Sequence, residues 1–251
     1  MDTKRSYGWT RDLPDKRDLR FTPRFAYALP NNVDLSHYTL EIYDQGELGS
    51  CTANAGAALF EMLRSINKKP TYIPSRLYTY YNTRKIEGTI PYDAGGQLRD
   101  AIKSLSVDGC PVETMWPYDI DKFTNRPPSP VYSEGRKHQI MKYSRVNNTV
   151  ITDVQNALAL NCPVMAGFTV YESFESQEVA QTGLMTMPQP WEKVLGGHAV
   201  LIVGYCNDHQ HFIVRNSWGA DWGDRGFFYA PYAYFTNSQL SADFWTASVA
   251  N

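Results

Sequence analysis

A cysteine and a histidine far apart in the chain have the residue types needed for nucleophilic acyl chemistry. Cys51 lies in the first turn of the segment with the clearest helical periodicity, where unpaired backbone N–H groups and the helix dipole favour an anion. A thiol placed there should have a lowered pKa, and its thiolate is the nucleophilic form. His198 could exchange the proton, because its ordinary pKa lies near neutrality. On position alone, a small buried hydrophobic residue is a somewhat better interpretation of Cys51.

A β-hairpin predicts what lies beside His198. Segments 198–205 and 211–218 are rich in β-branched and aromatic residues, and Asn207-Asp208 between them is typical of a turn. With the turn centred there, the numbers of opposed residues sum to roughly 414–416. His198 then faces roughly position 216 to 218, and position 216 is Asn216.

Three further side chains would complete a catalytic site. Asn216 could fix the tautomer of His198 through a hydrogen bond, and Trp218 could shield that bond from water. Gln45 precedes Cys51 across two glycines, and its amide could join the Cys51 N–H in stabilising an oxyanion. Each residue has an ordinary alternative: a satisfied core histidine beside an amide, or a surface glutamine. A helix-terminal cysteine that needs a base favours the catalytic interpretation.

Composition excludes several classes of protein. The 251 residues include 24 Lys and Arg against 26 Asp and Glu, which gives a formal net charge of −2. Without a basic excess we expect no nucleic-acid partner and no membrane partner, and the apolar runs are too short to span a bilayer. The four cysteines lack C-x-x-C spacing, so we expect no metal site and no cofactor.

The elements that must position these residues divide the chain into two parts. The predicted elements are helices opening at Ser50 and Ser75, helices over about 97–105 and 153–160, and strands over 163–171, 198–205 and 211–218. Helices first and strands later favour an α+β fold with two segregated lobes. A Pro-rich stretch at 125–130 is the expected crossing between lobes, and residues 1–28 are an expected extended arm.

Several blocks of sequence resemble the papain-like cysteine peptidases. The main blocks are Gln45-Gly46-Glu47-Leu48-Gly49-Ser50-Cys51-Thr52-Ala53, Gly197-His198-Ala199 and Asn216-Ser217-Trp218-Gly219. Supporting matches are Leu29-Pro30, Tyr92-Asp93-Ala94-Gly95-Gly96, Trp116-Pro117-Tyr118 and Gly223-Asp224-Arg225-Gly226-Phe227. Each block alone is a weak signal, but their family order across residues 29–235 makes a strong one.

The resemblance implies a papain-like α+β fold of two lobes with the active-site cleft between them. The helical lobe would span about 45–130, and an antiparallel, β-barrel-like lobe about 131–235 with the start of the chain. Residues 29–251 would form the catalytic domain. Residues 1–28 are similar to the short leaders of bacterial members, and could lie in the cleft or brace one lobe. We expect them to pack on the catalytic domain and limit access.

The resemblance also implies a role for each candidate residue. A Cys51 thiolate paired with a His198 imidazolium would attack a peptide carbonyl, and His198 would protonate the leaving amine. Asn216 would orient His198, while Gln45 and the Cys51 N–H would stabilise the oxyanion. Trp218 would also border the bound substrate.

The substrate-binding residues follow from the same resemblance. Gly95 and Gly96 would pair with the backbone of a bound peptide, which adds as a strand. Leu98, Gly167 and Ala199 would line the pocket for the side chain two residues before the cut. Because those walls are apolar and one lacks a side chain, we expect a roomy pocket that prefers bulky apolar residues.

The chain departs from the family pattern at three positions. Leu48 replaces a cysteine, and Asp93-Ala94 replaces a Cys-Asn pair, so one typical disulfide is absent. Thr52 stands where an aromatic residue usually follows the nucleophile. These changes alter packing beside the thiol but remove no catalytic group.

The other cysteines allow one bridge. If Gly167 and Ala199 are strand neighbours, the antiparallel register brings Cys162 close to position 204, near Cys206. A Cys162–Cys206 disulfide is then possible, and it would leave Cys110 as an odd, buried thiol.

The leading hypothesis is a monomeric cysteine endopeptidase that acts on peptides or proteins. An acyl transferase that passes the thioester to an amine would use the same residues, and an inactive peptide-binding member of the fold is a third possibility. The first ten residues lack the apolar stretch of a signal peptide. We expect a secreted or periplasmic protein whose leader has been removed, with a cytoplasmic location as the alternative.

Overall fold

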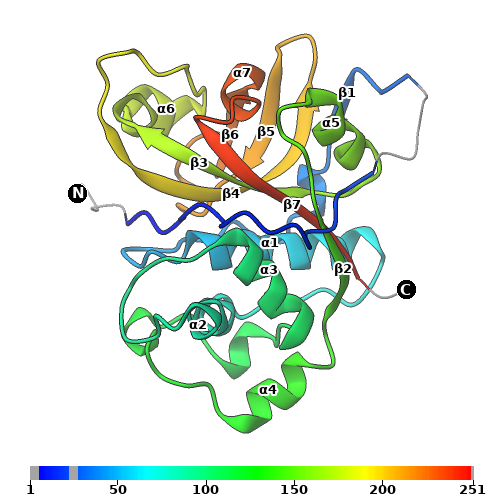
Figure 1. The fold of residues 1–251 in the computed structure, drawn as a ribbon, viewed down its shortest axis with the longest axis vertical. Helices are drawn as coiled ribbons and strands as arrows, with labels where there is room; N and C mark the ends of the chain where they lie inside the picture. The colour runs from blue at the N-terminus through cyan, green and yellow to red at the C-terminus, as the bar shows by residue number, and fades with distance from the viewer. Residues whose placement is uncertain (1–5, 23–27, 250–251) are drawn as a thin grey trace.

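A computed structural model describes residues 6–22 and 28–249. The helices are α1 (Cys51–Ile66), α2 (Arg76–Glu87), α3 (Leu98–Val107), α4 (Ser129–Gly135), α5 (Ile151–Ala159), α6 (Gln177–Thr182) and α7 (Tyr232–Phe235). The strands are β1 (Asn32–Asp34), β2 (Ile140–Arg145), β3 (Val164–Tyr171), β4 (Val194–Cys206), β5 (His211–Arg215), β6 (Phe227–Pro231) and β7 (Ser241–Val249). Figure 1 shows two layers, with the sheet above α1 and the other long helices below it.

The sheet is antiparallel throughout. Its strand order is β2-β7-β3-β4-β5-β6, and β1 pairs with β4 outside that path. In the described part of the chain β6 and β2 lie at opposite edges, so the sheet is open and the expected barrel-like closure is wrong. The two-lobed α+β prediction is confirmed, since the sheet and the helices form separate layers (Figure 1).

Helix α1 lies between the two layers. Every residue from Cys51 to Arg64 is buried, because one face of the helix meets the sheet and the other meets α2 and α3. The predicted starts of the first two helices are confirmed, with Ser50 and Ser75 at the two N-caps. The Ser75 side chain accepts a hydrogen bond from the backbone N–H of Tyr78, which satisfies one unpaired donor of the first turn.

The chain passes between the lobes later than expected. Helix α4 begins at the end of the Pro-rich stretch 125–130 and still lies in the lower layer (Figure 1). Its Val131 and Tyr132 pack against Tyr78 of α2. Burial of these apolar side chains keeps α4 with the helices, so the crossing occurs after it, where β2 joins the sheet.

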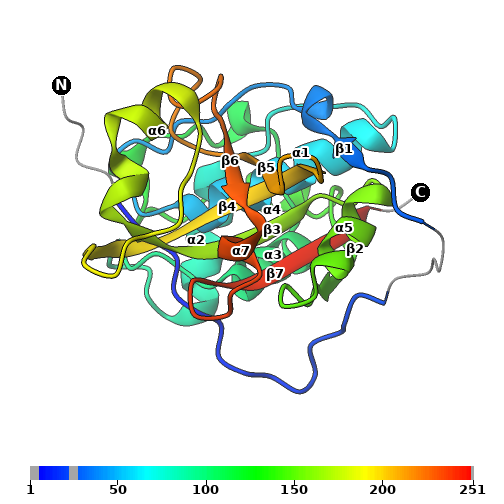
Figure 2. The same cartoon turned by 90° about the horizontal axis from the view of Figure 1, so that it is seen from above.

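Residues 6–22 form an extended segment. These residues lack helix and run along the junction of the two layers, shown in dark blue in Figure 1. Seen from above, the later part of this segment swings outward beyond β7 (Figure 2). The backbone N–H of Phe21 donates to the Arg145 carbonyl at 2.8 Å, which fixes the far end of the segment on β2.

The expected Cys162–Cys206 disulfide is wrong. All four cysteines lie in the described part of the chain, and each is a free thiol. Val164 pairs with Ile202 across β3 and β4, so Cys162, which precedes β3, comes level with position 204. Cys206 instead pairs with Asn32 of β1. The register is the one that the sequence predicts, but it leaves Cys162 and Cys206 as free thiols that no bond joins.

Candidate active site

The thiol of Cys51 lies where the chain turns into α1. Gly46 has a φ of +60°, a left-handed conformation that suits glycine and lets the loop double back before the helix. The carbonyl of Ser50 accepts the N–H of Asn54 at 3.0 Å, the bond that starts the helix. Cys51 is therefore in the first turn, among the backbone N–H groups that have no partner within the helix.

His198 and Asn216 meet as the hairpin predicts. Leu201 pairs with Arg215, and their residue numbers add to a value within the predicted range. This register brings the side chains of His198 and Asn216 together just beyond the last paired residues. His198 Nε2 donates to Asn216 Oδ1 at 2.8 Å, and Trp218 stacks on the imidazole with ring centroids 4.8 Å apart. The ring of His198 is thus held in both tautomer and plane.

Gln45 lies in the loop before α1 and is almost fully buried, with 1% of its surface exposed. Its Oε1 accepts from Ser217 Oγ at 2.7 Å, which orients the amide. Its Nε2 donates to the carbonyls of Leu48 and Ser6, at 3.0 and 3.2 Å. Ser6 belongs to the N-terminal arm, so the donor expected to bind an oxyanion already holds a carbonyl oxygen of the same chain.

The arm lies across the junction as an added strand. Gly96 N–H donates to the Gly8 carbonyl at 2.7 Å, and Thr10 N–H donates to the Gly96 carbonyl at 3.2 Å. On the other side, the Trp9 N–H donates to the Gly197 carbonyl at 2.9 Å. The pairing of Trp9 with Gly96 is parallel. The arm therefore pairs with a backbone predicted to bind substrate.

Close approach of the arm requires glycine on both sides. A Cβ atom on Gly167 would lie 2.0 Å from Trp9 Cε2, and one on Gly95 would lie 2.0 Å from the Gly8 carbonyl oxygen. The indole fills the space beside Gly167 and is only 7% exposed. Leu98 and Ala199, the other residues expected to line this pocket, are also buried.

Comparison with known proteins places this arrangement in a family. Residues 29–241 match the papain family cysteine protease domain. The chain belongs to the papain family. It is 39% identical to xylellain, a cysteine protease from Xylella fastidiosa, whose crystal structure superimposes with a TM-score of 0.92 over 99% of this chain and 98% of that one.

Two further relatives extend the match. An uncharacterized peptidase C1-like protein of Acanthamoeba polyphaga mimivirus is 39% identical over 98% of this chain and 88% of its own length. A cathepsin B-like protein of Giardia intestinalis is 26% identical over 86% of this chain and 68% of its own. The protein is thus a papain-family cysteine peptidase, a hydrolase of peptide or protein substrates. The predicted resemblance, including that to short-leader bacterial members, is confirmed.

Seating of the arm changes the chemistry of the peptidase thiol. The sequence predicts a lowered pKa for Cys51, but burial raises the pKa of this thiol to about 11, and backbone groups of Ala199, Gly8 and Thr52 offset only part of that rise. Gly8 belongs to the arm. The helix N-terminus still favours the thiolate, but exclusion of water has the larger effect while the arm is in place.

A charged cluster that the sequence does not reveal fastens the arm to the papain-family domain. Arg145 of β2 contacts Asp12 at 2.7 Å, Asp18 at 3.1 Å and Asp243 at 3.0 Å. Arg99 of α3 contacts Asp18 at 2.7 Å. Two of the three acids belong to the arm, so the two arginines bind it from both layers.

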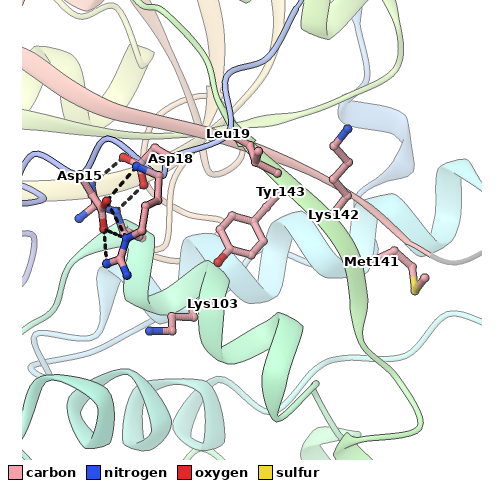
Figure 3. Close-up of a pocket in the computed structure, with 9 residues that line it drawn as sticks. Asp15, Asp18, Leu19, Lys103, Met141, Lys142 and Tyr143 are labelled. Atoms are coloured by element: carbon pink, nitrogen blue, oxygen red, sulfur yellow. Dashed lines mark hydrogen bonds and ion pairs between the residues drawn. The ribbon is translucent and has the colours of Figure 1, made fainter.

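A groove of about 440 Å³ opens beside this cluster. Figure 3 shows Asp15 and Asp18 of the arm on one side, with Lys103 of α3 and Met141 to Tyr143 of β2 around the rest. Because arm residues form one wall, this groove exists only while the arm is seated. We assign it no role in the reaction.

Two polar contacts hold the loops and lobes of the peptidase in register. The Gly49 N–H donates to the carboxylate of Asp93, at 3.1 and 3.0 Å from its two oxygens. This contact joins the two loops that the absent family disulfide would join. Between α1 and β5, Glu61 and Arg215 form a buried ion pair at 3.1 Å.

Neither a metal site nor a membrane-spanning helix is found in the described part of the chain. Among residues 6–22 and 28–249, His, Cys, Asp and Glu side chains form no group of three able to hold a metal ion. None of the helices described in the structure is both long and apolar enough to cross a bilayer.

Proposed function

We propose that this peptidase is an endopeptidase whose nucleophile is Cys51. The thiol proton first passes to His198, which gives a thiolate–imidazolium pair; the thiolate then attacks the substrate carbonyl carbon, and a tetrahedral oxyanion forms. When the oxyanion collapses, the C–N bond breaks and His198 protonates the leaving amine. Water that gives its proton to His198 then hydrolyses the thioester, which releases the acid and restores the thiol.

The contacts of His198 support its role as the base and acid. Its bond to Asn216 places the proton on Nε2, so exchange with sulfur takes place through Nδ1. Because a thiolate already supplies the negative charge, a neutral amide suffices to orient the imidazole. Stacking by Trp218 limits rotation of the ring and its exposure to water.

One observation carries the proposal: Gln45 Nε2 already donates to a peptide carbonyl, that of Ser6. The amide is buried and is held by Ser217, so it is oriented before any substrate binds. A preorganised donor of this kind contributes about 10²–10³-fold to the rate in acyl transfer.

We also propose that the arm is a reversible inhibitor in cis. Trp9 fills the pocket assigned to the side chain two residues before the cut, and Gly8 packs against Gly49, next to the nucleophile. In a productive substrate the pocket residue precedes the residue at the sulfur, whereas in the arm it follows. The arm therefore runs against the productive direction and blocks the site without offering a bond for cleavage.

The seat of Trp9 supports a preference for bulky apolar side chains at that position. A ring as large as indole fits beside Gly167 and packs in the apolar core cluster. A peptide library that showed strict preference for Arg or Asp there would contradict this assignment.

The experiment that tests the proposal is hydrolysis of a fluorogenic dipeptide amide. Turnover that is lost in Cys51→Ala supports the peptidase mechanism, and turnover only with an added amine acceptor would indicate an acyl transferase. Binding without turnover, together with a Cys51 that an epoxide reagent does not alkylate, would indicate an inactive binding protein. Removing residues 1–28 should raise the rate, and equal rates with and without them would defeat the inhibitory role.

A further inference from the structure

The pocket that holds Trp9 ends at a carboxylate. Trp9 Nε1 donates to Asp243 Oδ2 at 3.2 Å, and the backbone N–H of Asp12 donates to the same oxygen at 2.8 Å. Asp243 Oδ1 accepts from Arg145 at 3.0 Å. Asp243 is 5% exposed. An otherwise apolar pocket therefore contains one charged acceptor.

A distortion of β7 points this carboxylate at the pocket. Gly167 pairs with Ala242 and Met165 pairs with Trp245, so β7 has one more residue than β3 over this stretch. Asp243 lies on β7 between these two pairs, where the extra residue is accommodated, and has a φ of +61°. Such bulges turn a side chain away from its regular direction, and a left-handed aspartate costs free energy that a functional contact commonly explains.

Both donors to Asp243 Oδ2 belong to the arm. When the arm leaves, this oxygen loses the bonds from Trp9 and Asp12 together, while Oδ1 keeps its partner Arg145 on β2. In the open pocket water can donate to this oxygen, but a side chain that displaces the water without offering an N–H leaves the oxygen unsatisfied, which is costly. A substrate side chain that enters the same pocket is favoured if it brings an N–H to that oxygen.

The charges around the vacated pocket exclude a cation as the best partner. Departure of the arm removes Asp12 and Asp18 from Arg145, which keeps its contact with Asp243. The carboxylate left at the end of the pocket is therefore already paired with a cation. A neutral donor gains the hydrogen bond without repulsion from Arg145.

We propose that Asp243 is a specificity-determining residue that selects tryptophan two residues before the cut, above phenylalanine and above arginine. This inference rests on the proposed function, since it assigns the Trp9 pocket to substrate. It differs from a general preference for bulky apolar residues, because it requires the indole N–H.

Matched substrates test the indole N–H directly. Fluorogenic dipeptide amides would carry tryptophan, benzothienylalanine, phenylalanine or arginine at this position, and the second of these replaces the indole N–H by sulfur at nearly constant shape. With the full chain, kcat/KM for tryptophan should exceed that for benzothienylalanine by about tenfold. Seating of the arm lowers all rates by the same factor, so it cancels from the ratio.

Variants at Asp243 complete the test. Asp243→Gly tolerates the positive φ and removes the acceptor, so the ratio should fall to about one. Asp243→Asn keeps an oxygen and also tolerates this backbone conformation, so part of the preference should remain. Equal rates for tryptophan and benzothienylalanine in the unmodified chain, or a preference for arginine, would overturn the inference.

A second measurement does not depend on turnover. Trp9→Phe removes the indole N–H and one ring from the seated arm, so hydrogen exchange of the arm amides should accelerate by about tenfold for the lost hydrogen bond, and further for the lost packing. In the Asp243→Gly background only the packing is lost, so the same substitution should accelerate exchange about tenfold less. Equal acceleration in both backgrounds would refute the Trp9–Asp243 contact. Absence of all hydrolysis with this coupling intact would refute the proposed function instead.

Discussion

Gln45 has one amide N–H group in the position that both the arm and the reaction would use. With the arm seated, Nε2 donates to Ser6; during acylation the same donor would face the oxyanion. The two uses exclude each other. In our proposal, the side chain that Ser217 orients for catalysis would thus also contribute to inhibition.

Gln45→Ala should lower kcat by about 10²–10³-fold with little change in KM, because the donor acts on charge that develops only in the transition state. Steady-state hydrolysis of a fluorogenic dipeptide amide measures both constants. Gln189→Ala, at an exposed glutamine, is the matched control and should leave them unchanged. A loss smaller than about threefold in kcat would remove Gln45 from the mechanism.

Gly167 tests whether the arm and a substrate compete for one pocket. In Gly167→Ala the new methyl group would lie 2.0 Å from the Trp9 ring, so the arm must shift. Overpacking of this kind costs about 1–3 kcal/mol, and alkylation of Cys51 by an epoxide reagent should accelerate about tenfold in the full chain.

The control for that variant is Gly56→Ala in α1, where an added Cβ meets nothing closer than 3.4 Å. Its alkylation rate should match that of the unmodified chain. Mass spectrometry of the intact protein follows both reactions. If both variants react at the rate of the unmodified chain, the indole does not limit access to the thiol.

At the scale of elements, the relation between α1 and β5 determines whether sulfur and imidazole can meet. Cys51 starts α1, and Asn216 directly follows the end of β5. The buried pair of Glu61 and Arg215 joins these two elements, and Tyr43 donates a hydrogen bond to Glu61 beside it. The ion pair therefore fixes the spacing of the lobes close to the site.

Glu61→Ala should destabilise the protein by about 3–5 kcal/mol, because it leaves the Arg215 guanidinium buried without its partner charge. Urea unfolding measures the loss as a lower midpoint. Glu134→Ala, which removes the exposed pair with Lys137, should cost less than about 1 kcal/mol. Similar losses in both variants would show that the buried pair contributes nothing special.

Local patterns predict the elements but not their distant contacts. The turn at Asn207-Asp208 and the alternation on either side fix the register that brings His198 to Asn216, because a one-residue slip would reverse every side chain. The bulge at Asp243 has no such signal, since it depends on how β7 meets β3. Secretion stays a prediction. A disulfide would indicate an oxidising compartment, but all four cysteines are free thiols.

The position of the arm also lies beyond local pattern. Residues 6–22 are charged and aperiodic, which predicts extended chain but not what it covers. Trp9 resembles any other aromatic residue until the glycines opposite it, such as Gly167 and Gly197, are placed in space. The predicted low pKa of Cys51 failed for the same reason, because the sequence places the thiol on a helix but not beneath the arm.

At the scale of the whole molecule, protonation favours the seated arm. Burial, and then the nearby Asp243, raises the pKa of Asp12 to about 6, although Arg99, Trp245 and Arg145 oppose the rise. An exposed aspartate titrates near its ordinary value. The seated state thus binds this proton more tightly, so the contribution of Asp12 to seating is full below about pH 4 and is lost as the pH rises through 6.

Hydrogen exchange of the arm amides, corrected for intrinsic rates, should therefore show more protection at pH 4 than at pH 7. Asp12→Asn should flatten that difference, because its side chain does not titrate. Cys51 acts in the same direction, because burial raises the pKa of its thiol to about 11 while the arm is seated, and its contribution is lost as the pH rises through that value. Equal pH dependence in the Asp12→Asn variant and the unmodified chain would show that Asp12 does not set the trend.

The proposed inhibitor and the active site lie on one covalent chain, because the arm precedes β1. Its local concentration at the site is set by that tether and reaches the millimolar range for short links. Dilution of the enzyme would therefore not activate it, and a separate peptide with the sequence of the arm would block the open enzyme only at far higher amounts. Activation needs something that captures the displaced arm or cuts it from the chain.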